Sequence, residues 1–134
     1  MLDWHYKIKG KISNKMDKDL VKVSIYQSKS RNRDLSGKTL YCKFNKELSN
    51  GITTTGYVVF AIDLSNKRLY FKESNAMTGF KLYSIAKSSN YVEFKCSISE
   101  MDAKNIEKYS GYYSLKYDEN EKLHYVSFDE AKLY

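Results

Sequence analysis

The chain of 134 residues contains no proline and only two cysteines. Proline removes a ladder hydrogen bond inside a sheet, so its absence leaves long strands unobstructed. Cys42 and Cys96 lie far apart within apolar strand patterns, where we expect buried free thiols rather than a disulfide. No apolar run approaches the length that spans a bilayer, and Asp3 and Lys7 interrupt the start of the chain, where a signal peptide would be apolar. We therefore expect a single cytoplasmic domain over residues 1–134.

Signatures of catalysis and of metal binding are also missing. The sequence has two histidines and two cysteines, His5, Cys42, Cys96 and His124. Their separations are much longer than the spacings of about two to five residues between zinc ligands. Asp63 with Glu93 and Lys95 matches the loose acid, then acid-x-lysine order of one nuclease superfamily, but the full signature includes a proline. We expect a protein that binds rather than catalyses, without cofactor or metal.

Alternation of apolar and polar residues predicts about nine strands. The clearest signal is a hairpin of 57–62 and 68–71 around the polar turn 63–67. Its first arm is apolar at nearly every position, so we expect both faces of that strand to be covered. The other strands are expected at 3–9, 20–27, 38–44, 80–86, 91–98, 112–117 and 122–128.

One short helix is expected near 99–109, and a polar connection at 45–55. Ser99 is the expected N-cap, and Gly111 suits the position after the helix end. The fold class is thus all-β or β-dominated α+β, an antiparallel meander forming a barrel or a two-layer sheet. In strand count and in its late helix the chain resembles ligand-carrying barrels of the lipocalin kind, and this resemblance implies a small-ligand-binding β-barrel as one alternative.

The excess of positive over negative charge is confined to one part of the sequence. Residues 1–45 carry eleven Lys and Arg against four Asp and Glu, whereas residues 46–134 carry twelve of each. The whole net charge of +7 therefore belongs to the first third of the chain. Such asymmetry favours an anionic partner, although a merely solvated surface would have the same composition.

A basic, tyrosine-bearing sheet face is the strongest functional candidate. If strands 3–9, 20–27 and 38–44 pair as a meander, their outward side chains assemble lysines with tyrosines between them. Ammonium groups neutralise phosphates and tyrosine rings stack on bases, so this face predicts binding of single-stranded nucleic acid or of a nucleoprotein. The loop after Gln27 adds arginines that contact phosphate oxygens. The predicted nucleic-acid-binding residues are Lys7, Lys9, Lys22, Tyr26, Lys29, Arg31, Arg33, Tyr41 and Lys43.

The C-terminal part supports a different class of function. It is rich in tyrosine, which is enriched at protein interfaces, and its last predicted hairpin is acidic. An inhibitor that occludes the basic groove of a host nucleic-acid-processing or defence complex, an anti-CRISPR-like role encoded by a phage or plasmid, would use such a hairpin. The interface residues of this alternative are Tyr112, Tyr113, Tyr117, Asp118, Glu119, Glu121 and Tyr125.

Overall fold

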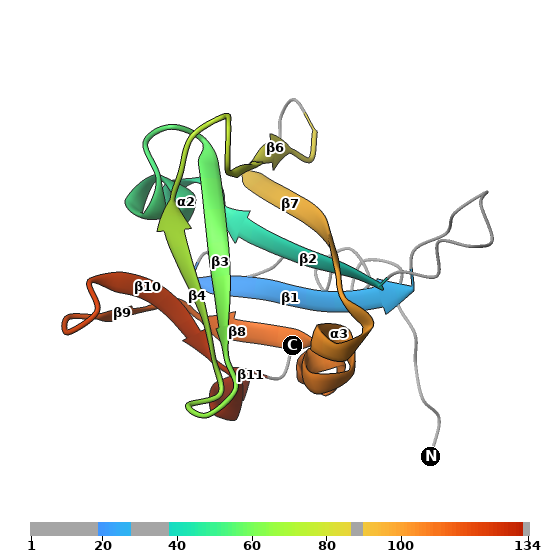
Figure 1. Cartoon of the computed structure of the whole chain (residues 1–134). Helices are drawn as coiled ribbons and strands as arrows, with labels where there is room; N and C mark the ends of the chain where they lie inside the picture. The colour runs from blue at the N-terminus through green and yellow to red at the C-terminus, as the bar shows by residue number, and fades with distance from the viewer. Residues whose placement is uncertain (1–18, 28–37, 87–89, 133–134) are drawn as a thin grey trace, which may run out of the picture.

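The computed structural model describes residues 19–27, 38–86 and 90–132, which form two antiparallel sheets and two α-helices (Figure 1). The six-stranded sheet, called sheet A here, has the order β11 (Ala131–Lys132), β8 (Gly111–Ser114), β1 (Leu20–Gln27), β2 (Lys38–Asn45), β7 (Tyr91–Ile98) and β6 (Tyr83–Ser84). The five-stranded sheet B has the order β5 (Phe80–Lys81), β3 (Tyr57–Asp63), β4 (Arg68–Glu73), β10 (Leu123–Ser127) and β9 (Lys116–Asp118).

The two sheets pack face to face around aromatic side chains. In Figure 1 sheet B lies in front of sheet A, and the strands of the two sheets cross at a steep angle. Phe44 of β2 meets Phe71 of β4 edge-on, with ring centroids 5.1 Å apart. Phe94 of β7 stacks on Phe60 of β3 at 6.0 Å. These contacts bury the alternating apolar residues of both sheets, which is why the period of two in the sequence gives strands rather than helices.

The prediction of a β-dominated fold is confirmed, whereas the alternative of a closed barrel is wrong. Sheet A ends at β6 and sheet B at β5, and each of these end strands has only two residues. They pair with only part of β7 and β3, so the two sheets do not join along this side. The predicted strand 80–86 corresponds to β5 and β6, which belong to different sheets.

The strand order also departs from the predicted meander. β1 lies between β2 and β8, and Leu20–Val23 pair with residues 111–114 near the other end of the chain. The chain then crosses from sheet A to sheet B at Leu115, between β8 and β9. The predicted strand 112–117 is therefore two short strands in different layers. The predicted strand 3–9 lies outside the described residues.

The expected helix is present and a second helix was missed. α3 (Glu100–Ile106) continues into the 3-10 turn η1 (Glu107–Tyr109), and the Ser99 hydroxyl accepts a hydrogen bond from the Asp102 N–H at 3.1 Å. α2 (Lys46–Ile52) occupies the predicted polar connection. Asn45 caps it by accepting from the Glu47 N–H at 3.0 Å, a role for which a short amide side chain is well suited.

The predicted hairpin is formed by β3 and β4, with Asp63 opposite Arg68. Its turn is closed by the Asp63 carboxylate, which accepts from the Asn66 N–H at 3.2 Å and from the Asn66 side-chain amide at 2.8 Å. The prediction that both faces of the first arm are covered is wrong, because Ala61 points out of sheet B and is exposed. Cys42 and Cys96 are buried free thiols, as predicted.

Candidate nucleic-acid interface

The outer surface of sheet A collects lysine and tyrosine side chains from five strands. Successive residues of a strand point to opposite faces, and Val21, Val23 and Tyr113 point into the core. Their neighbours in β1 and β8 therefore point outward, away from the viewer of Figure 1. We call this surface the basic face. Its described members include Lys22, Ser24, Tyr26, Tyr41, Lys43, Tyr91, Glu93, Lys95, Tyr112 and Lys132.

The strand register brings predicted site residues together. Lys22 of β1 stands directly opposite Lys43 of β2, and Ser24 stands opposite Tyr41. Tyr26 follows on the same face of β1 and is 41% exposed. Five other predicted members lie outside the described residues, namely Lys7, Lys9, Lys29, Arg31 and Arg33.

Residues from three further strands extend the face. Tyr112 of β8 lies opposite Lys22. In the predicted meander, residues 3–9 would have paired with β1 on this side. Lys132 of β11 lies opposite Tyr112. On the other side, β7 places Lys95 opposite Tyr41. The outward position of Lys95 follows from the alternation in 91–98, but that of Tyr112 beside Lys22 depends on a pairing between distant segments.

Lysine ammonium groups lie over tyrosine rings across the face. The Lys22 Nζ is 5.9 Å from the ring centroid of Tyr41 and 5.9 Å from that of Tyr112. The Lys95 Nζ is 5.8 Å from the Tyr41 ring, and the Lys43 Nζ is 4.8 Å from the Tyr91 ring. These distances are within the range of cation–π attraction. Positive charges and flat rings therefore lie side by side over adjacent strands.

Lys22 and Lys43 repel each other across adjacent strands. Burial lowers the pKa of Lys43, and the nearby Lys22 lowers it further, while Glu93 opposes the shift. Burial and a hydrogen bond with Glu93 raise the pKa of Tyr41, so its hydroxyl stays protonated at neutral pH. Glu93 is the one carboxylate among the members of the face given above, which also include four lysines. An anion bound between Lys22 and Lys43 would relieve their repulsion.

The residues of the alternative interface do not form one surface. Tyr112 belongs to the basic face, while Tyr113 points into the core, where its hydroxyl donates to the Tyr109 carbonyl and its ring meets Phe128 edge-on at 5.6 Å. Burial raises the pKa of Tyr113 to about 12. The other members lie on the hairpin of β9 and β10, where Tyr117 is 51% exposed.

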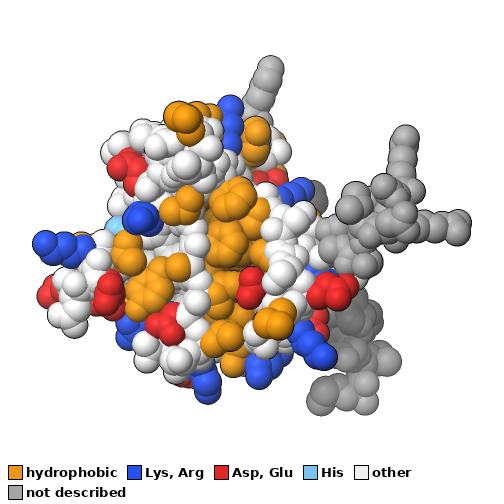
Figure 2. All heavy atoms as spheres, in the orientation of Figure 1, with side chains coloured by type: hydrophobic (Ala, Val, Ile, Leu, Met, Phe, Trp, Pro, Cys, Tyr) orange, Lys and Arg blue, Asp and Glu red, His pale blue; other side chains and the backbone are white. Residues whose placement is uncertain are grey.

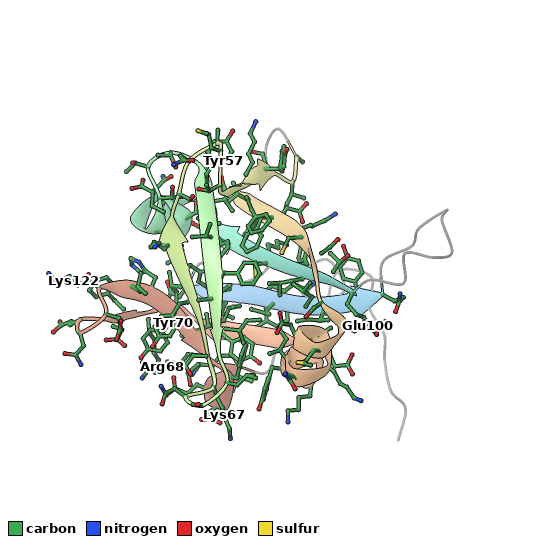
Figure 3. The ribbon with its side chains drawn as sticks, viewed as in Figure 1. Tyr57, Lys67, Arg68, Tyr70, Glu100 and Lys122 are labelled. Atoms are coloured by element: carbon green, nitrogen blue, oxygen red, sulfur yellow. The ribbon has the colours of Figure 1, made fainter. Side chains whose placement is uncertain are left out.

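Asp118 and Tyr125, two of those members, are engaged in contacts within sheet B. Arg68 and Tyr70 reach from β4 toward this hairpin (Figure 3). The Arg68 guanidinium donates to the Asp118 carboxylate at 2.9 Å and lies 4.2 Å from the ring centroid of Tyr125. Backbone N–H donation from Glu121, together with Arg68, lowers the pKa of Asp118. Asp118 thus holds the hairpin to β4, and Glu119 and Glu121 remain as its exposed acids.

We expect Tyr113→Phe to lower the free energy of unfolding by about 1 kcal/mol, because it removes a buried hydroxyl that satisfies the Tyr109 carbonyl. Tyr117→Phe is the matched control, and its exposed side chain should change stability by less than about 0.5 kcal/mol. Urea unfolding followed by circular dichroism measures both. Equal stability of the two variants would contradict the core position of Tyr113.

Other kinds of site find less support. Phenylalanine rings fill the space between the sheets where a ligand-carrying barrel would keep its cavity, with Phe44, Phe71 and Phe94 centroids 5.1 to 6.4 Å apart. Asp63 lies at the end of β3 in sheet B, whereas Glu93 and Lys95 lie in sheet A, so the nuclease-like order is divided between two layers.

Over residues 19–27, 38–86 and 90–132, no group of three or more His, Cys, Asp or Glu side chains is arranged to hold a metal ion. None of the helices in these same ranges has the length and apolar character needed to cross a bilayer. None of the protein-family models, curated protein sequences or solved structures compared with the chain matches it.

Proposed function

We propose that the protein binds single-stranded nucleic acid, free or within a nucleoprotein, through the basic face. The observation that carries this proposal is the placement of Lys22, Lys43 and Lys95 beside tyrosine rings, at 4.8 to 5.9 Å from the ring centroids. Single-strand-binding surfaces combine cations that follow the backbone with aromatic rings on which bases stack. Adjacent strands of one sheet, about 4.8 Å apart, bring both kinds of side chain together on this face.

In this proposal the lysines and tyrosines have separate roles. Lys22 and Lys43 share one phosphate at the centre of the face, and Lys95 and Lys132 contact phosphates on either side. A base stacks on the ring of Tyr112, displacing Lys22 from the ring to the phosphate, or on the exposed ring of Tyr26. The protein acts by binding, without cofactor or catalysis, in the cytoplasm where nucleic acids are accessible.

Tyr112→Ala should weaken binding of a fluorescein-labelled single-stranded oligonucleotide by about 1 to 3 kcal/mol, because a stacked base loses its ring. Tyr117→Ala is the matched control, since this tyrosine is more exposed but lies on the β9–β10 hairpin. Fluorescence anisotropy at several salt concentrations measures both. Equal affinities of the two variants would contradict the proposal that bases of the oligonucleotide stack on the basic face.

A protein inhibitor is the second candidate. It is favoured by the β9–β10 hairpin, which projects from the body of the molecule in Figure 1 and carries the exposed Tyr117 beside Glu119 and Glu121. An aromatic anchor next to acids suits a basic groove on a partner protein.

A further inference from the structure

β3 has a stretch of main chain that pairs with no other strand in the part of the chain that the structure describes. The direction of its main-chain groups follows from two hydrogen bonds at its start: the Ser74 N–H donates to the Tyr57 carbonyl at 2.9 Å, and the Leu82 N–H donates to the Gly56 carbonyl at 2.9 Å. Odd-numbered residues of β3 therefore bond to β4, and even-numbered residues point to the side of β5.

β5 covers only the beginning of that side. It pairs with Tyr57 and Val58, and no described residue pairs with β3 beyond them on this edge. The N–H and C=O groups of Phe60 and Ile62 thus point to an open edge. Figure 3 shows β3 passing from Tyr57 down to the turn that holds Lys67, and this edge is its side toward β7.

An apolar strip lies along the open edge. Figure 2 shows it on the surface between the positions of β3 and β7 in Figure 1. Phe60, Ile62, Phe80 and Ile98 are only partly buried against the core. The ring centroids of Phe60 and Phe80 are 5.7 Å apart. Side chains of an added strand would pack on this strip at every second residue.

The edge also lacks the usual protection against strand pairing. Natural edge strands carry charged side chains, proline or a bulge that discourage the approach of another strand. The segment 57–62 contains no charged residue and no proline, and the outward side chain at the centre of its free part is the small Ala61. An edge of this composition is suited to pairing.

We propose that the edge of β3 at Phe60 and Ile62 is a strand-addition site for an extended, acidic segment of a partner protein. Phe60 and Ile62, with one residue between them, each present an N–H and a C=O group at this edge. An added antiparallel strand would form four hydrogen bonds with these groups. A second copy of the chain is disfavoured because each copy carries a net charge of +7, whereas an acidic segment is attracted by that charge. This site lies in sheet B and does not depend on the binding of nucleic acid by sheet A.

The test uses an acetylated, amidated peptide that alternates valine with threonine and has a glutamate at each end. Main-chain hydrogen bonds supply most of the affinity in strand addition, so a simple alternating sequence is a sufficient probe. In the full-length protein, the peptide should slow amide hydrogen exchange at Phe60 and Ile62, measured by NMR. N-methylation of the peptide on the edge that faces β3 should abolish this protection.

Two variants locate the site. Ile62→Pro removes an N–H that points to the free edge and is compatible with an edge strand, so it should weaken peptide binding by about tenfold with the circular dichroism spectrum retained. Ala61→Glu adds a negative charge at an exposed position of the edge and should weaken binding of the acidic peptide by repulsion, without touching the core. Ala131→Glu, an equally charged change at an exposed alanine of sheet A, should leave binding unchanged.

The proposal is overturned if saturating peptide leaves the exchange of Phe60 and Ile62 unchanged. It is also overturned if the protein forms dimers that Ile62→Pro dissociates, because a second copy would then be the occupant. Equal peptide binding by Ala61→Glu and the unchanged protein would likewise contradict it.

Discussion

Replacing Lys22, Lys43 and Lys95 together by glutamate is expected to weaken binding of a single-stranded oligonucleotide by about a hundredfold or more at low salt. Each lysine lost from a phosphate contact removes about 0.7 from the slope of log affinity against log salt, so the slope should fall by about 2. The three side chains lie on adjacent strands of one face, and the substituted carboxylates would repel the same phosphates. Anisotropy titrations between low and moderate salt measure both quantities.

A matched triple variant separates the basic face from net charge. Lys46, Lys72 and Lys104 are exposed on α2, β4 and α3, and their replacement by glutamate changes the net charge by the same amount. This variant should retain most of the affinity. Glutamine at Lys22, Lys43 and Lys95 provides a milder change if the glutamates disturb the half-buried part of the sheet. Equal loss of affinity in the two glutamate variants would mean that only overall charge matters.

Phe94→Ala is expected to lower the free energy of unfolding by about 3 to 5 kcal/mol, a large part of the stability of a domain this size. The Phe94 ring is 1% exposed and lies within 5.8 to 6.4 Å of four other phenylalanine rings from both sheets. Its removal leaves a cavity that neighbours on rigid strands cannot fill. Urea unfolding at constant pH measures the loss.

Tyr83→Ala is the control for this substitution. Tyr83 is 60% exposed on β6, so removing its ring should change stability by less than about 0.5 kcal/mol. A loss of less than about 1 kcal/mol for Phe94→Ala would contradict the packing of the two sheets on this ring.

The parts of the fold that depend on neighbouring residues could be predicted from the sequence. Alternation in 20–27, 38–44 and 91–98 identified buried positions that the structure confirms, and Ser99 marked the start of α3. These signals are local, because the period of a strand and the cap of a helix are decided within a few residues. The short helix α2 was not predicted, because its residues Ser49, Asn50 and Gly51 are also typical of turns.

The order of the strands in the sheets could not be predicted from such local signals. Nothing near Leu20 indicates that it pairs with Ser114, and nothing near Leu115 distinguishes a continuous strand from a crossing between layers. The basic face was therefore predicted with Lys22, Tyr41 and Lys43 but without Tyr112 or Lys132. Those two residues reach the face only through the pairing of β8 with β1 and of β11 with β8.

This pairing also determines when the protein acquires its shape during synthesis. β1 is translated early, yet its edge at Leu20–Val23 remains uncovered until residues 111–114 have left the ribosome. At roughly 5 to 20 residues per second, this edge of the nascent strand remains unpaired for on the order of 10 seconds. Contacts between such distant segments also slow folding itself. The nascent chain should thus depend on chaperones, and a fragment that ends before β8 should neither fold nor present the complete basic face.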